Sequence, residues 1–517
     1  MLGRMDVHVT LGEALSRHRA GDEAAAEHLY RAVLATSPGH ASAAHLCGLM
    51  LRNQGRLREA VTLYEAALDA APGNWRVAAG LAQALVGLGR DGRAAARRAV
   101  AESGGAAEAR FALGAALRAA GEAAAAEAVL RDALARTPAD ARAQLALGNA
   151  LADQDRRDEA EVAMRAAAAA DPSLAEAWAS LGWLLAGDGR LADAVACCDR
   201  AIGLRPDFAE AYWNRSFARL LGGDFPRGFA DYEWRRQHGR FAAGAERAPP
   251  GEEWRGGPLA GRRLLVDAEQ GLGDTIQLAR YLPVLATMGA AVTLCCPPPL
   301  LRLFAGLGVG LAPRGGPLPE YDLWVDQMSL PLLLGTVPQT IPSPAGYLAA
   351  DPALRATWAA RLPPGPRIGV VWAGNPAHSN DARRSMPPEA LLPLLHGTKV
   401  SAVSLQVGPS SGLAAILGLA DNASALADFA ATAGLVACLD HVVAVDTSTA
   451  HLAGALGVPV SVLLPFAPDW RWMHGRADSP WYAAMRLYRQ PRPGDWTEPV
   501  ARLTADLAAR WPAAGAG

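Results

Sequence analysis

Two short segments of the sequence bring glycines, hydroxyls and acids together directly after an apolar run, an arrangement that can bind an anionic ligand. The first, DAEQGLGDTIQLARY, places Gly271, Gly273 and Asp274 between such a run and a helix-like stretch. The glycines would let the backbone approach a ligand closely, and Asp274 can be the N-cap of the helix. Spacing alone does not separate a ligand-binding turn from an ordinary capped turn.

The second segment, HVVAVDTSTAHLAGALG, has the same order of apolar run, polar turn and helix. Asp446 ends the run, Thr447, Ser448 and Thr449 form the turn, and His451 follows in the helix. Free N–H groups and hydroxyls at a helix start form an anion site, which suits a diphosphate. His451 would contact phosphate or serve as a capping or core residue. Two such turns predict one ligand site built from two parts of the chain.

Both turns lie in a second half where short apolar runs alternate with helical patterns. Besides LLVDA at the first turn, the runs are 291–296, 321–327, 367–374, 399–406, 441–446 and 459–465. Strands separated by helices indicate parallel βαβ units, and the proline-rich stretch IPSPAGYLAADP divides them into two α/β subdomains. We expect a ligand cleft between the two sheets, at the carboxyl ends of their strands.

The first half of the chain is a repeat. Helix-like stretches end in prolines at intervals of 34 residues, or once of 66, at Pro38, Pro72, Pro138, Pro172 and Pro206. Small residues recur in register, with Gly48, Gly114, Gly148 and Gly182 inside first helices and Gly55, Gly89, Gly121 and Gly189 in turns. The first set allows close helix packing, and the second supplies a positive φ. The spacing resembles six or seven tetratricopeptide repeats, whose concave face usually binds an extended polypeptide; a passive spacer is the alternative.

Composition argues against several classes of function. A net charge of −2 and a pI near 6.6 leave no basic field for nucleic acid. The six cysteines include two adjacent pairs and no Cys-x-x-Cys spacing, which argues against a zinc site and a disulfide framework. The start has no signal-peptide pattern and no apolar run has membrane length, so we expect a cytoplasmic protein without a membrane span.

At its two polar turns the second half, about 262–510, resembles GT-B glycosyltransferases of the heptosyltransferase-like family, glycosyltransferase family 9. The family's GD turn reads Gly273-Asp274 here, and its donor-diphosphate segment reads DTSTAHL, with Ser448 in place of a glycine. The arrangement of repeats ahead of such a domain is similar to O-GlcNAc transferase and to bacterial protein glycosyltransferases that include those acting on flagellin.

The resemblance implies sugar transfer from a nucleotide sugar. The segment VVWAGNPAHSNDARRSMP looks like the family's donor-side loop, which makes Arg384 its basic residue in place of a lysine. An oxocarbenium-like transition state needs a base for the acceptor hydroxyl and positive charge or dipoles for the departing diphosphate. Asp274 is the candidate base, and Arg384 with the 446–451 turn suits the diphosphate. No clear Asp-x-Asp motif accompanies them, so we expect neither a metal nor a cofactor.

Further polar and aromatic residues lie at strand ends and turns. Asn375 and Gln406 on the donor side, and Gln270 and Gln277 near the first turn, would bind sugar or base or cap the backbone. The segment Trp470-Arg471-Trp472 would stack on the nucleotide or pack as an aromatic core.

The sequence therefore predicts an all-helical tetratricopeptide superhelix followed by a GT-B fold of two Rossmann-like halves. The predicted domains are the array over 8–240, a linker over 241–262, an acceptor-side half over 263–350 and a donor-side half over 351–510. The predicted function is that of a protein O-glycosyltransferase whose repeats recruit a protein acceptor, with flagellin one candidate. A non-catalytic scaffold with the same fold and a lipopolysaccharide or cell-envelope sugar transferase are the alternatives.

Overall fold

The computed structural model describes residues 6–238, 248–342, 346–378 and 380–512, and the chain forms two compact units. The first comprises the residues up to Leu184 together with Arg200–Pro206. The second comprises Leu185–Asp199 and everything from Asp207 onward. The second unit therefore contains the last helices of the repeat region as well as both α/β halves.

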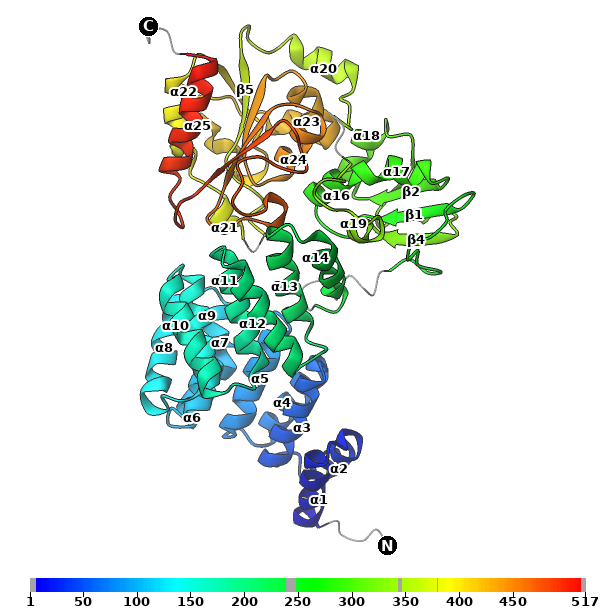
Figure 1. The fold of residues 1–517 in the computed structure, drawn as a ribbon. Helices are drawn as coiled ribbons and strands as arrows, with labels where there is room; N and C mark the ends of the chain where they lie inside the picture. Colours follow the sequence, from blue (N-terminus) through cyan, green and yellow to red (C-terminus); the bar gives the residue numbers. More distant parts are fainter. Residues whose placement is uncertain (1–5, 239–247, 343–345, 379, 513–517) are drawn as a thin grey trace. The chain divides into compact units, whose positions relative to one another are not determined.

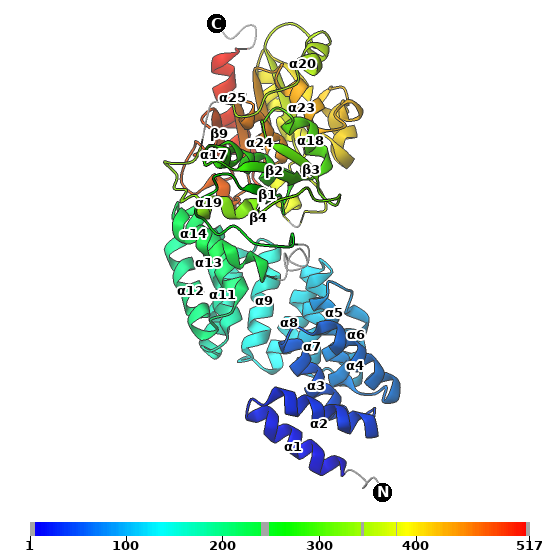
Figure 2. The ribbon, with the colours of Figure 1, turned by 90° about the vertical axis from the view of Figure 1, so that its right-hand side faces the viewer.

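The repeat region is a series of helical hairpins, which Figure 1 and Figure 2 show stacked one after another through the first unit. The helices of the first pairs are α1 (Val7–Arg19), α2 (Glu23–Thr36), α3 (Ala41–Asn53), α4 (Leu57–Ala70), α5 (Trp75–Gly87), α6 (Arg93–Glu102), α7 (Ala107–Ala119), α8 (Ala123–Arg136), α9 (Ala141–Asp153) and α10 (Arg157–Ala170). The series continues with α11 (Ala175–Gly187), α12 (Leu191–Leu204), α13 (Ala209–Leu221) and α14 (Phe225–Tyr232).

The glycine register of the repeats has the predicted physical cause. A Cβ atom at Gly48 in α3 would overlap the ring of Tyr64 in α4, so glycine is what allows this close packing. The turn glycines have positive φ, from 69° at Gly89 to 80° at Gly121. In the next repeat Asp155 takes the turn position with a φ of 57°, which aspartate tolerates better than most residues.

The second unit contains two sheets in which all the described strand pairs are parallel. The first sheet has the order β3-β2-β1-β4, formed by β1 (Arg263–Asp267), β2 (Ala291–Cys296), β3 (Gly310–Pro313) and β4 (Leu323–Asp326). The second has the order β6-β5-β7-β8-β9, formed by β5 (Arg367–Val371), β6 (Ser401–Ser404), β7 (His441–Val445), β8 (Val460–Leu464) and β9 (Met485–Arg489). The predicted fold class, a helical repeat array followed by parallel α/β structure, is confirmed.

The helix after β1 differs from the expectation that Asp274 would be its N-cap. Helix α16 (Leu272–Leu278) begins earlier and gives way to a 3₁₀ turn, η2 (Ala279–Tyr281), before α17 (Leu282–Thr287). Pro283 lies at the start of α17, where its missing N–H costs nothing. Gly273 and Asp274 therefore lie in the first turn of α16 rather than ahead of it.

The remaining helices cover the sheets. They are α18 (Leu301–Phe304), α19 (Leu330–Leu333), α20 (Pro352–Ala359), α21 (Asp381–Arg384), α22 (Leu392–Gly397), α23 (Phe429–Val436), α24 (Ser448–Ala455) and α25 (Thr497–Arg510). None of the helices in the described part of the chain combines the length and the hydropathy that a bilayer span requires.

The predicted linker is partly described, since residues 241–247 lie outside the described ranges. In its second part, the N–H of Trp254 donates to the carbonyl of Trp324 at 2.7 Å, and the N–H of Trp324 donates to Glu252 at 3.0 Å. Trp254 is buried, so this stretch adds a short edge to β4 and belongs to the α/β core. In the proline-rich stretch between the halves, 343–345 also lie outside the described residues.

Candidate functional site

The two polar turns of the sequence lie against each other in the structure. A Cβ atom at Gly273, in the first turn of α16, would lie 3.0 Å from Cδ2 of His451 and 3.4 Å from Cα of Ser448. Both of those residues belong to α24, which follows β7. The absent side chain at position 273 is what lets the two helix starts approach so closely. The fold thus brings together two segments that the sequence analysis expected to share a site.

Asp274 is the third residue of α16 and not its N-cap, which is Gly271. The Oδ2 atom of Asp274 accepts a hydrogen bond from the N–H of Gly271 at 2.9 Å. Its Oδ1 atom pairs with Nη2 of Arg471 at 2.7 Å, and the side chain is 25% exposed. The expected N-cap role of Asp274 is therefore wrong: its carboxylate caps the N–H of Gly271 from inside the first turn. The same carboxylate also faces the buried cation Arg471.

Arg471 connects this carboxylate to the second half of the α/β structure. Its Nε donates to Oε1 of Gln277 at 2.7 Å, its Nη1 donates to Oδ1 of Asp469 at 2.8 Å, and the guanidinium lies 4.3 Å from the ring centre of Trp470. Burial opposes the charge, but Asp274 and Asp469 hold the pKa of Arg471 above its usual range, so it remains a cation. From the sequence, Arg471 was expected only to stack; the acid two residues earlier, Asp469, was the local signal of an ion pair.

The two tryptophans beside Arg471 are core residues. Trp470 packs edge-on against Phe229 with ring centres 5.5 Å apart, and Trp472 stacks on His451 at 5.2 Å. Both indoles are buried. These contacts support core packing, which was the alternative to stacking on a nucleotide.

Thr447 is the N-cap of α24, yet its hydroxyl does not cap the helix. Its Oγ1 atom has no hydrogen-bond partner among the described residues, although Thr447 is only 9% exposed. The first N–H groups of any helix lack partners within the helix. Together with Ser448 and Thr449 behind it, this hydroxyl places unused hydrogen-bonding capacity at the positive end of a helix.

Asp446 precedes this turn and titrates in an unusual range. Burial and the nearby carboxylate of Asp469 raise the pKa of Asp446 to about 6, with Trp472, Arg384 and Arg471 opposing the shift. The guanidinium of Arg384 therefore acts electrostatically on the first residue of the 446–451 turn. A carboxyl group with this pKa changes charge near neutral pH.

Arg384 ends α21, and its guanidinium lies beside the backbone of Gly374. A Cβ atom at Gly374 would lie 2.6 Å from Nη2 of Arg384, so glycine makes room for the guanidinium. The Nε atom donates to Oδ1 of Asp381 at 3.3 Å. The side chain is 15% exposed, and among the described residues its one ion pair is the long contact with Asp381, which leaves donors for a ligand.

Two residues predicted on the donor side make bonds to the backbone. Oε1 of Gln406 accepts from the N–H groups of Trp372 and Ala373, and its Nε2 donates to the carbonyls of Ala373 and Val407. Asn375 is exposed, and its Oδ1 accepts from the backbone two residues later. Both side chains therefore cap backbone groups, as the alternative prediction had it. Binding of a nucleotide sugar by either residue stays a prediction.

His451 is buried between Trp472 and Tyr482. Its Nδ1 lies 3.0 Å from the hydroxyl of Tyr482. Burial holds the pKa of His451 well below its usual range, and the nearby cations Arg471, Arg280 and Arg384 add to the effect. The imidazole is therefore neutral at neutral pH, so it can meet a phosphate only as a neutral hydrogen-bond donor.

Comparison with known proteins identifies the repeat region. Residues 51–97 and 145–207 match family models described as tetratricopeptide repeat. Protein FlbA of Caulobacter vibrioides is 28% identical over 363 residues, which are 57% of this chain and 61% of that protein. The chain therefore covers less than two thirds of the length of this relative.

Two solved structures of repeat proteins are also similar to part of the chain. A tetratricopeptide repeat protein from Parabacteroides merdae matches with a TM-score of 0.37 and 19% identity, over 45% of this chain and 92% of that one. YrrB, a repeat protein described as having an unusual peptide-binding site, matches with a TM-score of 0.25 and 21% identity, over 35% of this chain and 95% of that one. On the matches of its own sequence, the first half of the chain is an array of tetratricopeptide repeats, an architecture that binds other proteins.

Proposed function

We propose that the protein is a glycosyltransferase that moves a sugar from a nucleoside-diphosphate sugar to a hydroxyl group of a protein held by the repeats. The observation that carries the proposal is the meeting of the two helix starts, with the unpartnered Thr447 hydroxyl at one and the Asp274 carboxylate at the other. One side offers an anion site and the other a proton acceptor.

The anion site suits the departing diphosphate. Negative charge grows on this group as the sugar–oxygen bond breaks, so donors fixed in advance lower the barrier. The N-terminus of α24, the hydroxyl of Thr447 and the guanidinium of Arg384 are such donors. Arg384 can offer two parallel N–H groups to one phosphate. This chemistry needs no metal ion.

The acceptor hydroxyl must lose its proton as it attacks. The Oδ2 atom of Asp274 accepts one hydrogen bond and its Oδ1 atom forms an ion pair with Arg471, but a carboxylate oxygen has a second lone pair for an incoming hydroxyl. Arg471 holds the carboxylate in one orientation through Oδ1. A base held in place by its partners loses less entropy in the reactive complex.

The repeats offer a surface for the protein acceptor. A groove of about 180 Å³ is lined by residues from α3, α5, α7 and α9, the first helices of successive pairs, among them His45, Arg52, Gln83, Glu108 and Phe111. Charges of both signs with an aromatic ring between them suit a polypeptide of mixed sequence. This surface favours a protein acceptor over the lipid-linked sugar of a cell-envelope transferase.

Transfer to protein can be tested by intact-mass measurement. The full chain is incubated with a panel of nucleoside-diphosphate sugars and with proteins captured from the source cell on the repeats. We expect one donor to add a sugar mass to a captured protein, and Asp274→Ala to abolish the addition. Asp428→Ala is the matched control, because Asp428 also caps a helix and pairs with an arginine, Arg302, at 2.7 Å.

The outcomes separate the alternatives. A sugar mass on a lipid-linked acceptor and on none of the proteins would indicate a cell-envelope transferase. Absence of donor binding together with absence of transfer would indicate a scaffold and refute the proposal.

A further inference from the structure

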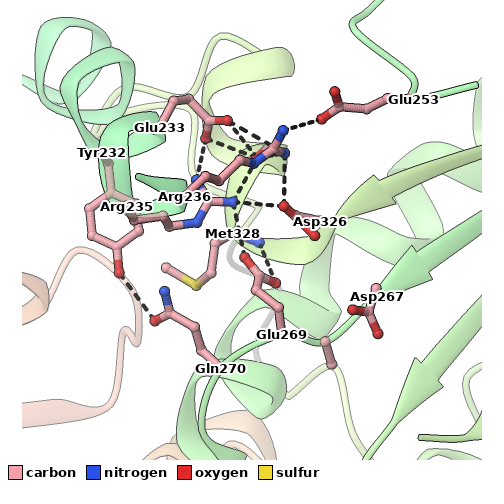
Figure 3. Close-up of polar contacts among 12 residues, drawn as sticks. Tyr232, Glu233, Arg235, Arg236, Glu253, Asp267, Glu269, Gln270, Asp326 and Met328 are labelled. Atoms are coloured by element: carbon pink, nitrogen blue, oxygen red, sulfur yellow. Dashed lines mark hydrogen bonds and ion pairs between the residues drawn. The ribbon is translucent and has the colours of Figure 1, made fainter. Parts of the chain in front are cut away.

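The last helices of the repeat region share a compact unit with the two sheets, and they end at the first sheet. Helix α14 runs directly into a 3₁₀ turn, η1 (Glu233–Arg236), which lies by the carboxyl ends of β1 and β4 (Figure 3). Arg235 in this turn is only 2% exposed. Its Nη2 lies 3.0 Å from Oε1 of Glu269 and 3.4 Å from Oδ2 of Asp326. Glu269 stands two residues ahead of Gly271, so the repeat region contacts the segment that leads into α16.

Tyr232 makes a second contact with the same segment. Its hydroxyl donates to Oε1 of Gln270 at 3.1 Å, as Figure 3 shows. The guanidinium carbon of Arg235 lies 5.5 Å from the centre of the Tyr232 ring. Two neighbouring residues of one helical repeat thus hold Glu269 and Gln270, the two residues that precede the glycines of the turn.

The last repeat also contacts Trp470, which follows β8 of the second sheet. The ring of Trp470 packs edge-on against Tyr232, with ring centres 6.1 Å apart, and against Phe229. Trp470 in turn supports the guanidinium of Arg471, which pairs with Asp274. Two groups fix the Asp274 carboxylate, the N–H of Gly271 and the guanidinium of Arg471. The last repeat contacts a neighbour of each, Gln270 beside Gly271 and Trp470 beside Arg471.

Burial and a neighbouring carboxylate disfavour the ionised form of Glu269. Burial raises the pKa of Glu269 to about 7, and Asp326 adds to the shift while Arg235 opposes it. Without the guanidinium, the ionised carboxylate would face a second carboxylate in a buried place. Arg235 thus favours the ionised form of Glu269 in the packed turn.

We propose that Tyr232 and Arg235 are positioning residues: the last helical repeat holds the Glu269–Asp274 turn, and with it the carboxylate that accepts the proton, in its reactive place. The chemical part rests on the proposed function, whereas the hold on the turn does not. In this arrangement the repeat region sets the rate of transfer in addition to capturing the acceptor, and it leaves the donor site at Thr447 and Arg384 unaffected.

The test uses three variants of the full chain and one control. Tyr232→Phe keeps the ring that packs on Trp470 and removes only the hydroxyl that binds Gln270. Arg235→Gln removes the cation, and Arg235→Lys restores it as the conservative variant. Arg219→Gln is the control, because Arg219 in α13 pairs at 2.6 Å with Asp231 in α14 and, within the described part of the chain, has no hydrogen bond or ion pair with the turn.

Amide hydrogen exchange over residues 269–278 reports on the turn without any need for activity. One lost neutral hydrogen bond should speed local exchange roughly three- to tenfold in Tyr232→Phe, and Arg235→Gln should exceed this. We expect kcat to fall about tenfold in both, with the donor Kd unchanged, and Arg235→Lys to recover part of the loss. Arg219→Gln should match the parent in exchange over this segment.

The proposal and the proposed function can fail separately. If the parent transfers no sugar but Tyr232→Phe still loosens the turn, the proposed function is wrong and the hold on the turn stands. If the parent transfers sugar and Tyr232→Phe changes neither exchange nor kcat, the positioning role is overturned. A weaker donor Kd equal to the loss in rate would also overturn it, because the effect would then lie in binding.

Discussion

Replacement of Asp274 by asparagine separates the proposed base role of this residue from its structural role. Asparagine keeps an oxygen that can accept the hydrogen bond from the N–H of Gly271, so the capping bond survives. It cannot accept a proton, and it loses the charge that faces Arg471 at 2.7 Å. Rate and stability are therefore expected to change by different amounts.

The stability change follows from the surroundings of Arg471. An exposed ion pair contributes about 0.2–1 kcal/mol, and loss of one partner of a buried pair costs about 3–5 kcal/mol. The Asp274 side chain is 25% exposed, and Arg471 keeps its bond to Asp469 at 2.8 Å, so the cost should lie between these two ranges, at about 1.5 kcal/mol. The rate of transfer should fall roughly a hundredfold or more, because the proton has no acceptor.

Urea unfolding, donor calorimetry and a transfer assay on the same preparations measure the three quantities. Asp469→Asn is the matched control, since it loses a similar bond to the same guanidinium and should destabilise the protein by a similar amount while transfer stays within a few-fold of the parent. Transfer by Asp274→Asn within a few-fold of the parent would remove Asp274 from the mechanism. An equal loss of transfer in both variants would assign the effect to the placement of Arg471.

Three further predictions concern the donor site and the domain boundary. Arg384→Ala should weaken nucleotide-sugar binding roughly ten- to a hundredfold in calorimetry, and unchanged affinity would reject its contact with the diphosphate. The folded pKa of Asp446 is raised to about 6, so the fold is more stable at low pH, where this carboxyl is protonated, and loses stability as the pH rises through that value. Asparagine cannot ionise, so Asp446→Asn should stabilise the fold more at about pH 7.5 than at about pH 4 in urea unfolding. A chain of residues 207–517 should melt cooperatively in calorimetry and one of residues 248–517 should not, since Phe225 and Phe229 belong to the same core cluster as the sheets; equal melting of the two would contradict this.

Local patterns were sufficient for much of the fold. The repeat period and its turn glycines follow from backbone rules within a few residues, and the φ values of Gly89 and Gly121 confirm them. Fully buried strands such as β7 and β8 read as continuous apolar runs and were expected where they occur. The edge strands β3 and β9 were missed because neither has an uninterrupted apolar run. One is short and bounded by glycine and proline, and the other alternates charged with apolar residues.

The sequence by itself determined that two polar turns follow buried strands, because a strand and its following helix are encoded in adjacent residues. Only the tertiary structure decided that α16 meets α24 and that Arg471 pairs with Asp274. It also decided that Arg235 and Tyr232, at the end of the repeats, hold the turn that carries Asp274. The physical reason is that a buried charge or amide needs a partner, and the chain supplies that partner from residues far apart in sequence, where no local period or propensity marks it.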